Sequence, residues 1–303
     1  MLSCLLGEIE GFVNVGEAAL HFFMKCPPIP CGCGARVQDC SFWKDVPANR
    51  RVQEFGQEFF RVRHVPKRAL KGHFGGSKEV QDLIRSMHDL YQSIAEKTGA
   101  RVIVDSSKNP VVAYALSRVP GIRLSVIHLI RSPQGVVSSW LRPKGYLSIA
   151  PAWRVALSWS LVNPFAERIA GWQPAHHWTI RYEDLTENPK MFVEAIAAEV
   201  LGRPIPCSFL QGNRAAVKVQ HILAGNPDKL ERSDLVIEKR NPVLPRTTNL
   251  AVSLLTFPLT LRYGYVWAHN RWLAPIRFPF ADEFQKRSGL PFSLERPTVS
   301  LPH

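Results

Sequence analysis

Long apolar runs are missing from this sequence. No stretch approaches the roughly 18 residues that a helix needs to cross a bilayer. The first residues also lack the basic, apolar, small-residue order of a signal peptide. We therefore expect no membrane span and a cytoplasmic location. Internal repeats and low-complexity tracts are missing as well, which argues against a repeat architecture.

Acidic residues are under-represented. The 303 residues include 25 Asp and Glu against 38 Lys and Arg, a net charge of +13. This excess favours an anionic partner, such as a nucleotide, a polyanion, a membrane surface or a nucleic acid. The basic residues are dispersed and no aromatic-basic module accompanies them, so we expect no nucleic acid. With 46% hydrophobic residues, the chain can bury a substantial core.

Paired C-x2-C knuckles, which ordinary zinc sites use, are absent too. Four of the six cysteines nevertheless cluster with the spacing C-x4-C-x-C-x6-C. In a reducing compartment such a cluster indicates free thiols or a metal rather than disulfides. We favour a structural thiol-rich turn over zinc and expect no metal. The clustered cysteines are Cys26, Cys31, Cys33 and Cys40.

Helical and strand periodicities alternate along the middle of the chain. Helices are predicted over 77–98, 108–121, 133–140 and 150–172 and from Pro189. Buried strands are predicted over 101–107, where the run ends in polar residues, and over 123–130 and 176–182. This alternation predicts an α/β fold, a three-layer sandwich with a central, mostly parallel sheet.

The pattern decays towards the carboxyl end. We expect an α/β domain over residues 1–267 and a proline-rich tail over 268–303, extended or partly disordered. The prolines that punctuate this tail are Pro275, Pro279, Pro291, Pro297 and Pro302.

Polar segments follow the predicted strands, where an open parallel sheet collects its ligands. Arg131 closes the second strand and could offer a planar fork to a phosphate, and Ser139, two helical turns later, could add a hydroxyl. In the alternative, Arg131 pairs with a carboxylate such as Glu183 and Ser139 faces solvent. The sequence leaves both alternatives open.

Six short motifs together resemble the bacterial-type sulfotransferases that use 3'-phosphoadenosine 5'-phosphosulfate. The resemblance spans residues 2 to about 265 and implies a fold like that of the P-loop nucleotide hydrolases. The motifs are "FVNVGE", "CGCG…C…FW", "VDSSKNP", "LIRSPQGVVSSW", "RYEDLTENP" and "HILAGNP".

The resemblance assigns roles to five residues. Arg131 and Ser139 would hold the 3'-phosphate of the donor, and Tyr182 would lie near its adenine. Lys108 resembles a lysine that stabilises charge on the transferring sulfonate; alternatively it is a solvated lysine at a helix start. Glu17 resembles the base that accepts the acceptor's proton; alternatively it caps a helix or forms a salt bridge.

His221, in "HILAGNP", is a weaker candidate for the base, since a histidine in such a loop more often has a structural role.

The sequence also departs from the family pattern at its start. Family members begin with a strand and a loop of the form Arg/Lys-Ser-Gly-Ser/Thr, whereas "MLSCLLGEIEG" already lies in the following helix. The first strand and the 5'-phosphosulfate loop are therefore missing, which would leave the neighbouring strands with unpaired backbone groups. Either Met1 is an internal methionine, which we favour, or the chain is a degenerate copy.

The predicted function is transfer of a sulfonate group from 3'-phosphoadenosine 5'-phosphosulfate to a hydroxyl or amine, with no metal. The acceptor, whether a small molecule, a lipid or a carbohydrate, is not readable from the sequence. The alternative is a truncated, catalytically inactive homologue that binds nucleotide or serves as a scaffold.

Overall fold

The computed structural model describes residues 1–24, 30–46, 49–61, 77–142, 150–170, 177–218, 221–223, 234–239, 241–268 and 271–273. Within these ranges no helix is both long and apolar enough to cross a membrane. The α-helices are α1 (Leu2–Leu6), α2 (Ala18–Phe23), α3 (Arg50–Phe59), α5 (Lys78–Thr98), α6 (Pro110–Leu116), α7 (Pro133–Trp140), α8 (Ala152–Ala170), α9 (Tyr182–Glu187), α10 (Pro189–Leu201), α11 (Arg246–Thr256) and α12 (Leu259–Arg262).

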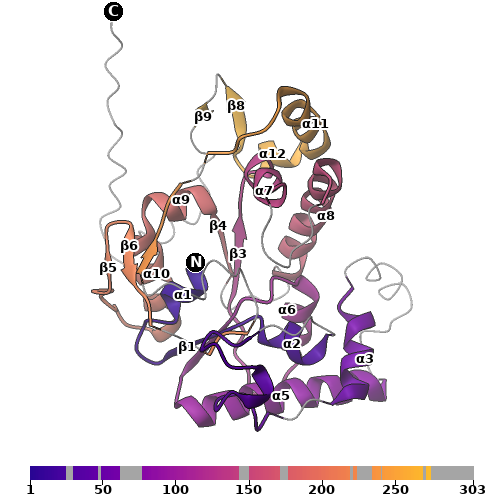
Figure 1. The fold of residues 1–303 in the computed structure, drawn as a ribbon, viewed down its shortest axis with the longest axis vertical. Coiled ribbons are helices and arrows are strands. Elements are labelled where there is room, and N and C mark those ends of the chain that lie inside the picture. The colour runs from indigo at the N-terminus through magenta and orange to yellow at the C-terminus, as the bar shows by residue number, and fades with distance from the viewer. Residues whose placement is uncertain are drawn as a thin grey trace, which may run out of the picture.

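The strands form small separate sheets (Figure 1). β1 (Phe12–Gly16) pairs in parallel with β2 (Val102–Asp105), and β3 (Val126–Ile130) pairs in parallel with β4 (His177–Arg181). An antiparallel sheet contains β5 (Leu210–Gln211), β6 (Arg214–Ala216) and β7 (Asp234–Val236), and β8 (Val266–Ala268) pairs with β9 (Arg271–Leu273). The fold is therefore mixed α/β, as the alternation of periods predicts.

Local sequence signals explain where several elements begin and end. Ser77 caps α5 by accepting a hydrogen bond from the amide of Val80 at 3.3 Å, and Gly99 closes the helix in the left-handed region at φ 63°. Pro189 occupies the first turn of α10, where its missing amide hydrogen is not needed. The three predicted strands correspond to β2, β3 and β4.

Sequence periodicity missed β1. Its middle residue, Asn14, is polar and interrupts the apolar run, but its side chain is buried and accepts a hydrogen bond from the amide of Gly16 at 3.1 Å. The domain boundary predicted after residue 267 falls inside β8, and most of 268–303 lies outside the described residues. The division into a domain and a tail therefore stays a prediction.

Two hydrophobic clusters cover opposite faces of the parallel strands. Along β2, the side chain of Ile103 packs against the cluster that includes α5 and α6, whereas Val102 and Val104 pack against the cluster of α1 and α10. This alternation is the period-2 pleat of a strand buried on both faces. In Figure 1, α1 and α10 accordingly lie on one side of β3, and α6 and α8 lie on the other.

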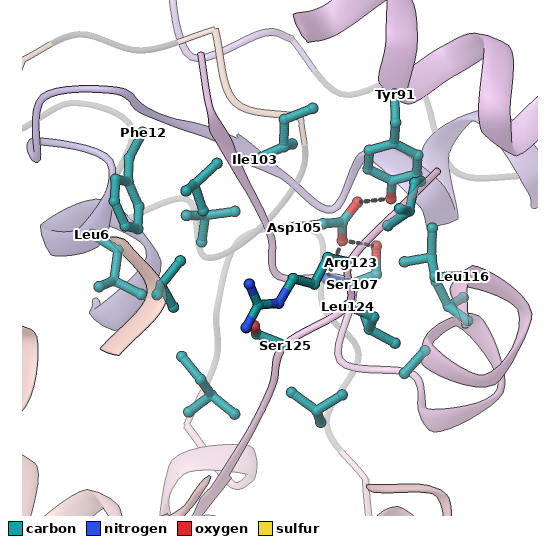
Figure 2. Close-up of a pocket in the computed structure, with 18 of the residues that line it drawn as sticks. Leu6, Phe12, Tyr91, Ile103, Asp105, Ser107, Leu116, Arg123, Leu124 and Ser125 are labelled. Carbon is teal, nitrogen blue, oxygen red and sulfur yellow. Dashed lines mark hydrogen bonds between the residues drawn. The ribbon is translucent and has the colours of Figure 1, made fainter. Parts of the chain in front are cut away.

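The single central sheet that the sequence predicts is replaced by two parallel pairs. Among the described residues, β2 pairs only with β1 and β3 pairs only with β4. A cavity of about 880 Å³ separates the facing edges of β2 and β3, and Arg123 reaches into it (Figure 2). We refer to this cavity as the slot. Its lining includes residues 101–105 of the β2 segment and 123–129 of the β3 segment.

The volume of the slot is similar to the space that one strand occupies between two layers of a fold. A five-residue strand spans about 17 Å, with about 4.8 Å between neighbouring strands and about 10 Å between layers, or roughly 800 Å³. Among the described residues no strand pairing joins β2 to β3 across the slot.

Hydrogen exchange should reveal the open edges. In a parallel strand successive residues direct their amides to opposite neighbours, so every second amide of β2 and β3 faces the slot. We expect these amides to exchange at least about ten-fold faster than the amides paired with β1 or β4. Native-state exchange followed by NMR measures this alternation, and uniform protection along β3 would show that its edge is paired.

Candidate functional site

The carboxyl ends of β1 and β2 are held together by Asp105. Its carboxylate accepts hydrogen bonds from the hydroxyl of Tyr91 at 2.8 Å and from the amide of Ser107 at 2.8 Å (Figure 2). It also accepts one from the amide of Ala19 at 3.0 Å. Glu17, the residue before α2, makes no side-chain cap. Asp105, at the end of β2, takes that role by accepting from the amide of Ala19 in the first turn of α2. The position of Glu17 therefore depends on β2.

Withdrawal from water raises the pKa of Asp105 above its ordinary value, although the hydrogen bonds from Ser107, Tyr91 and Ala19 oppose the shift. The same desolvation, with the negative charge of Asp105 second, raises the pKa of Tyr91 well above its usual range. The phenol is therefore a fixed hydrogen-bond donor to the carboxylate.

The two residues predicted to be catalytic lie in contact at this edge. The ammonium of Lys108 is 2.5 Å from a carboxylate oxygen of Glu17, with 70% of the lysine side chain exposed and only 15% of the glutamate side chain. Lys108 adopts φ 56°, a left-handed conformation that costs a non-glycine residue about 1–2 kcal/mol. Of the alternatives for Glu17, the salt bridge is present and the helix cap is absent.

Asn109, the residue after Lys108, holds this turn in place through its side chain. The side chain of Asn109 accepts from the amide of Val111 at 2.9 Å and donates to the carbonyl of Phe60 at 2.9 Å. These bonds begin α6 at Pro110 and hold the preceding turn in place. Because Lys108 and Asn109 also line the slot, this turn stands where the slot meets the strand ends.

A second group lies at the ends of β3 and β4. The guanidinium of Arg131 stacks on the ring of Tyr182, with its central carbon 4.7 Å from the ring centroid. The Arg131 side chain runs over Gly135, where an added Cβ would meet its Nε at 2.8 Å. Glycine therefore leaves room for the arginine along the first turns of α7. Ser139 follows one turn after Gly135 on the same helix face.

The alternative pairing of Arg131 with Glu183 does not form. One carboxylate oxygen of Glu183 accepts from the amide of Ser132 at 3.1 Å, and the other accepts from the hydroxyl of Tyr265 at 2.7 Å. Within the described residues Arg131 makes no ion pair. Burial, with the charge of Glu183 second, raises the pKa of Tyr265 far above its usual range, so this phenol stays protonated.

A third group gathers three thiols and an imidazole. The Sγ atom of Cys40 lies 3.7 Å from that of Cys33, 3.7 Å from that of Cys31 and 3.2 Å from Nδ1 of His221. The four ligand atoms all lie within 4.8 Å of one another. The structure therefore places His221 in this cluster, and Cys26 lies outside the described residues.

The thiols differ in their ionisation. Burial raises the pKa of Cys31 to about 12. Burial also acts to raise the pKa of Cys40, but hydrogen bonds from the amides of Phe42 and Trp43 outweigh it and lower that pKa. Spacing within the sequence could not reveal this cluster, since about 180 residues separate His221 from Cys40.

Asp105 and Tyr91 are functional-site residues that the sequence analysis missed. Both belong to segments that the sequence predicts, a strand and a helix, and a tyrosine on the buried face of a helix indicates packing before it indicates a polar contact. The signal available was the aspartate that closes "VIVD", since a carboxylate at the end of a buried strand needs donors from elsewhere. Which donors it finds depends on the fold.

Comparison with known proteins gives a structural similarity but no match of sequence families. A scan against protein-family models finds no match, and a search of curated proteins finds none. Among solved structures, the chain is similar to a sulfotransferase domain from the curacin biosynthetic pathway, with a TM-score of 0.46 and 18% identity. The similarity covers 84% of this chain and 92% of that domain, and at this level it carries over no activity.

Replacing the carboxylate should loosen this edge of the fold. Asp105→Asn places an amide donor where the carboxylate accepts from Ala19, Tyr91 and Ser107, and we expect a loss of about 1–3 kcal/mol in the free energy of unfolding. Urea denaturation measures the loss. An unchanged midpoint and slope would contradict the capping role of Asp105.

The pH dependence of this loss has a defined sign. Because the pKa of Asp105 is raised in the folded state, its protonation adds stability that is fully present below the ordinary pKa and disappears as pH rises through the raised value. Asp105→Asn lacks this contribution. The difference in the free energy of unfolding between the parent and Asp105→Asn, measured by urea denaturation at several pH values, should therefore become smaller as pH increases.

Proposed function

We propose that this protein is a sulfotransferase that binds 3'-phosphoadenosine 5'-phosphosulfate and passes its sulfonate group to a hydroxyl or amine. The observation that carries the proposal is the position of Arg131. Its guanidinium stands at the end of β3 without a carboxylate partner among the described residues, against the ring of Tyr182. A fork of this kind is suited to a phosphate, and an aromatic ring beside it is suited to a base.

Arg131 and its neighbours would hold the 3' end of the donor. The guanidinium would take the 3'-phosphate, the hydroxyl of Ser139 would assist from the same face of α7, and Tyr182 would lie against the adenine. The first turn of α7 begins beside Arg131 and adds the positive end of a helix dipole. The net charge of +13 favours capture of an anion by the whole molecule.

Glu17 and Lys108 would carry the transfer. The oxygen of the acceptor hydroxyl attacks the sulfur atom while the bond from sulfur to the bridging phosphate oxygen breaks. The carboxylate of Glu17 receives the acceptor's proton, and the 3',5'-bisphosphate nucleotide leaves. Lys108, with 70% of its side chain exposed, would move from Glu17 to the sulfonate oxygens and stabilise their charge.

The 5' end of the donor would lie where the slot opens at the carboxyl edge of β2 and β3. The lining of the slot runs along β2 and β3 and reaches Lys108. A parallel strand seated between β2 and β3 would direct its following loop towards this carboxyl edge, where backbone amides can cradle a phosphosulfate. We propose that a strand followed by Arg/Lys-Ser-Gly-Ser/Thr completes the site. Without it, the Arg131 group alone corresponds to the alternative function, an inactive nucleotide-binding protein.

Nucleotide binding should depend on Arg131. In a calorimetric titration with adenosine 3',5'-bisphosphate, we expect Arg131→Ala to lose about 2 kcal/mol or more, roughly a 30-fold increase in Kd, because a charge-assisted contact to phosphate is removed. The matched control is Arg154→Ala, which removes the same charge from an exposed position on α8. Equal affinities for the parent and Arg131→Ala would remove the basis of the donor assignment.

Transfer should depend on Glu17 once the slot is filled. The assay uses a chain extended at its amino end by a β-branched strand and an Arg-Ser-Gly-Thr loop, and follows sulfonate transfer to a panel of phenols, sugars and amines. In this chain, Glu17→Gln should lower the rate about 10²- to 10⁴-fold, since the base is lost, while Kd for the bisphosphate stays unchanged.

The control for this variant is Glu10→Gln, an exposed carboxylate outside the strand ends, which should keep the full rate. If the extended chain binds the bisphosphate through Arg131 but transfers to no acceptor, the inactive nucleotide-binding function replaces the enzyme. If Glu17→Gln transfers at the parent rate, the base is another group.

A further inference from the structure

We propose that Cys31, Cys33, Cys40 and His221 bind one Zn²⁺ ion in a tetrahedral structural site. The proposed transfer reaction does not use these residues, so the zinc site and the sulfotransferase function can fail independently.

Four of the six distances between the ligand atoms are close to those around a single zinc ion. With Zn–S bonds of about 2.3 Å and a Zn–N bond of about 2.1 Å, a tetrahedron has S···S edges of about 3.8 Å and S···N edges of about 3.6 Å. The observed S···S separations from Cys40 to Cys33 and to Cys31 are both 3.7 Å. The S···N separations from His221 are 3.2 Å to Cys40 and 3.8 Å to Cys31.

The same distances argue against other uses of the thiols. A disulfide brings two sulfurs to about 2.05 Å and would leave the histidine and a third thiol aside. All three cysteines are instead free thiols that share one centre with the imidazole. An iron–sulfur cluster needs its ligands further apart, because several metal and sulfide ions lie between them. Three thiolates and one imidazole around one ion are a ligand set that structural zinc sites use.

Binding of Zn²⁺ to these four residues requires no other reactant. Each thiol releases one proton to solvent on binding, and neutral His221 binds through Nδ1, so no oxidant or reductant is required. With four protein ligands the coordination is closed, which leaves no position for a substrate and indicates a structural ion. Cys31 and Cys40 are buried and Cys33 is exposed, so the ion can enter from the Cys33 side.

The surroundings of the cluster orient its ligands. The amide of Trp43 donates to the carbonyl of Cys40 at 3.0 Å, which fixes the backbone that carries this thiol. The ring of Phe42 stacks on the imidazole of His221 with centroids 5.1 Å apart and an interplanar angle of 11°. The indole nitrogen of Trp43 donates to the carbonyl of His221 at 2.8 Å. These contacts set the histidine ring and its backbone before any ion binds.

The ion would tie two distant segments to the catalytic edge. Gly32 donates its amide to the carbonyl of Ile222 at 2.9 Å, and Leu223 continues into a parallel bridge with Gly16. The amide of Glu17 donates to the carbonyl of Leu223 at 2.6 Å. A side chain at Gly16 would overlap the backbone of Leu223, so glycine allows the two segments to touch. Zinc at the cluster would therefore hold residues 221–223 against β1, beside Glu17.

The test measures metal bound by the full chain. Protein prepared with reduced thiols is incubated with ZnSO₄, freed of loosely bound metal and analysed by plasma mass spectrometry. Co²⁺ in place of Zn²⁺ reports the geometry through the visible bands of tetrahedral thiolate coordination. We expect one ion per chain and a tetrahedral cobalt spectrum.

Cys33→Ser is the first variant, because its side chain is exposed and the fold should tolerate the change. We expect its affinity for Zn²⁺ to fall by at least 10- to 100-fold, roughly the loss known for weaker perturbations of zinc sites. His221→Ala tests the fourth ligand in the same way. Cys4→Ser, which alters a buried thiol outside the cluster, should keep one ion per chain.

A second measurement, amide hydrogen exchange, reports whether zinc holds residues 221–223 against β1. Removal of zinc by a chelator should speed exchange of the amides of Glu17 and Leu223 by about ten-fold or more, while the amides of α10 stay protected. Parent protein that retains no Zn²⁺, or that binds it no more tightly than Cys33→Ser, overturns the proposal. A cobalt spectrum without tetrahedral thiolate bands also overturns it.

Discussion

The arrangement of the carboxyl ends of β1 and β2 depends on the contacts of the Asp105 carboxylate. This carboxylate closes β2, receives the hydroxyl of Tyr91 from α5 and caps α2 through the amide of Ala19. Three elements from separate parts of the sequence therefore meet on one group that is costly to leave unsatisfied. Glu17 stands at the start of α2 and reaches Lys108 because this contact holds the helix beside β2.

The two parallel pairs divide the proposed work between them. Glu17 and Lys108 belong to the ends of β1 and β2, whereas Arg131 and Tyr182 belong to the ends of β3 and β4. The slot separates the pairs, with the space of one strand between them. Two hydrophobic layers enclose the parallel strands, with α1 and α10 on one face and α5 and α6 on the other.

The thiol cluster adds a second support for β1. Residues 221–223 lie against the strand on its outer side, opposite β2, and join it through the bridge between Gly16 and Leu223. A structural ion would stabilise this arrangement by linking residues that are far apart along the chain, where ordering of the segment is otherwise opposed by chain entropy. The site that sequence spacing disfavours becomes plausible because His221, and not a fourth cysteine, completes it.

The sequence by itself determined the elements whose signals are local. Periodicity, the Ser77 cap and Pro189 predicted α5, α8, α10 and strands β2 to β4, and the polar strand ends predicted where Arg131 and Lys108 stand. Only the tertiary structure decided which groups meet: Lys108 with Glu17, Arg131 with Tyr182 in preference to Glu183, and His221 with three thiols. The physical reason is that local propensities act over a few residues, whereas these contacts depend on how elements distant in the chain pack and pair.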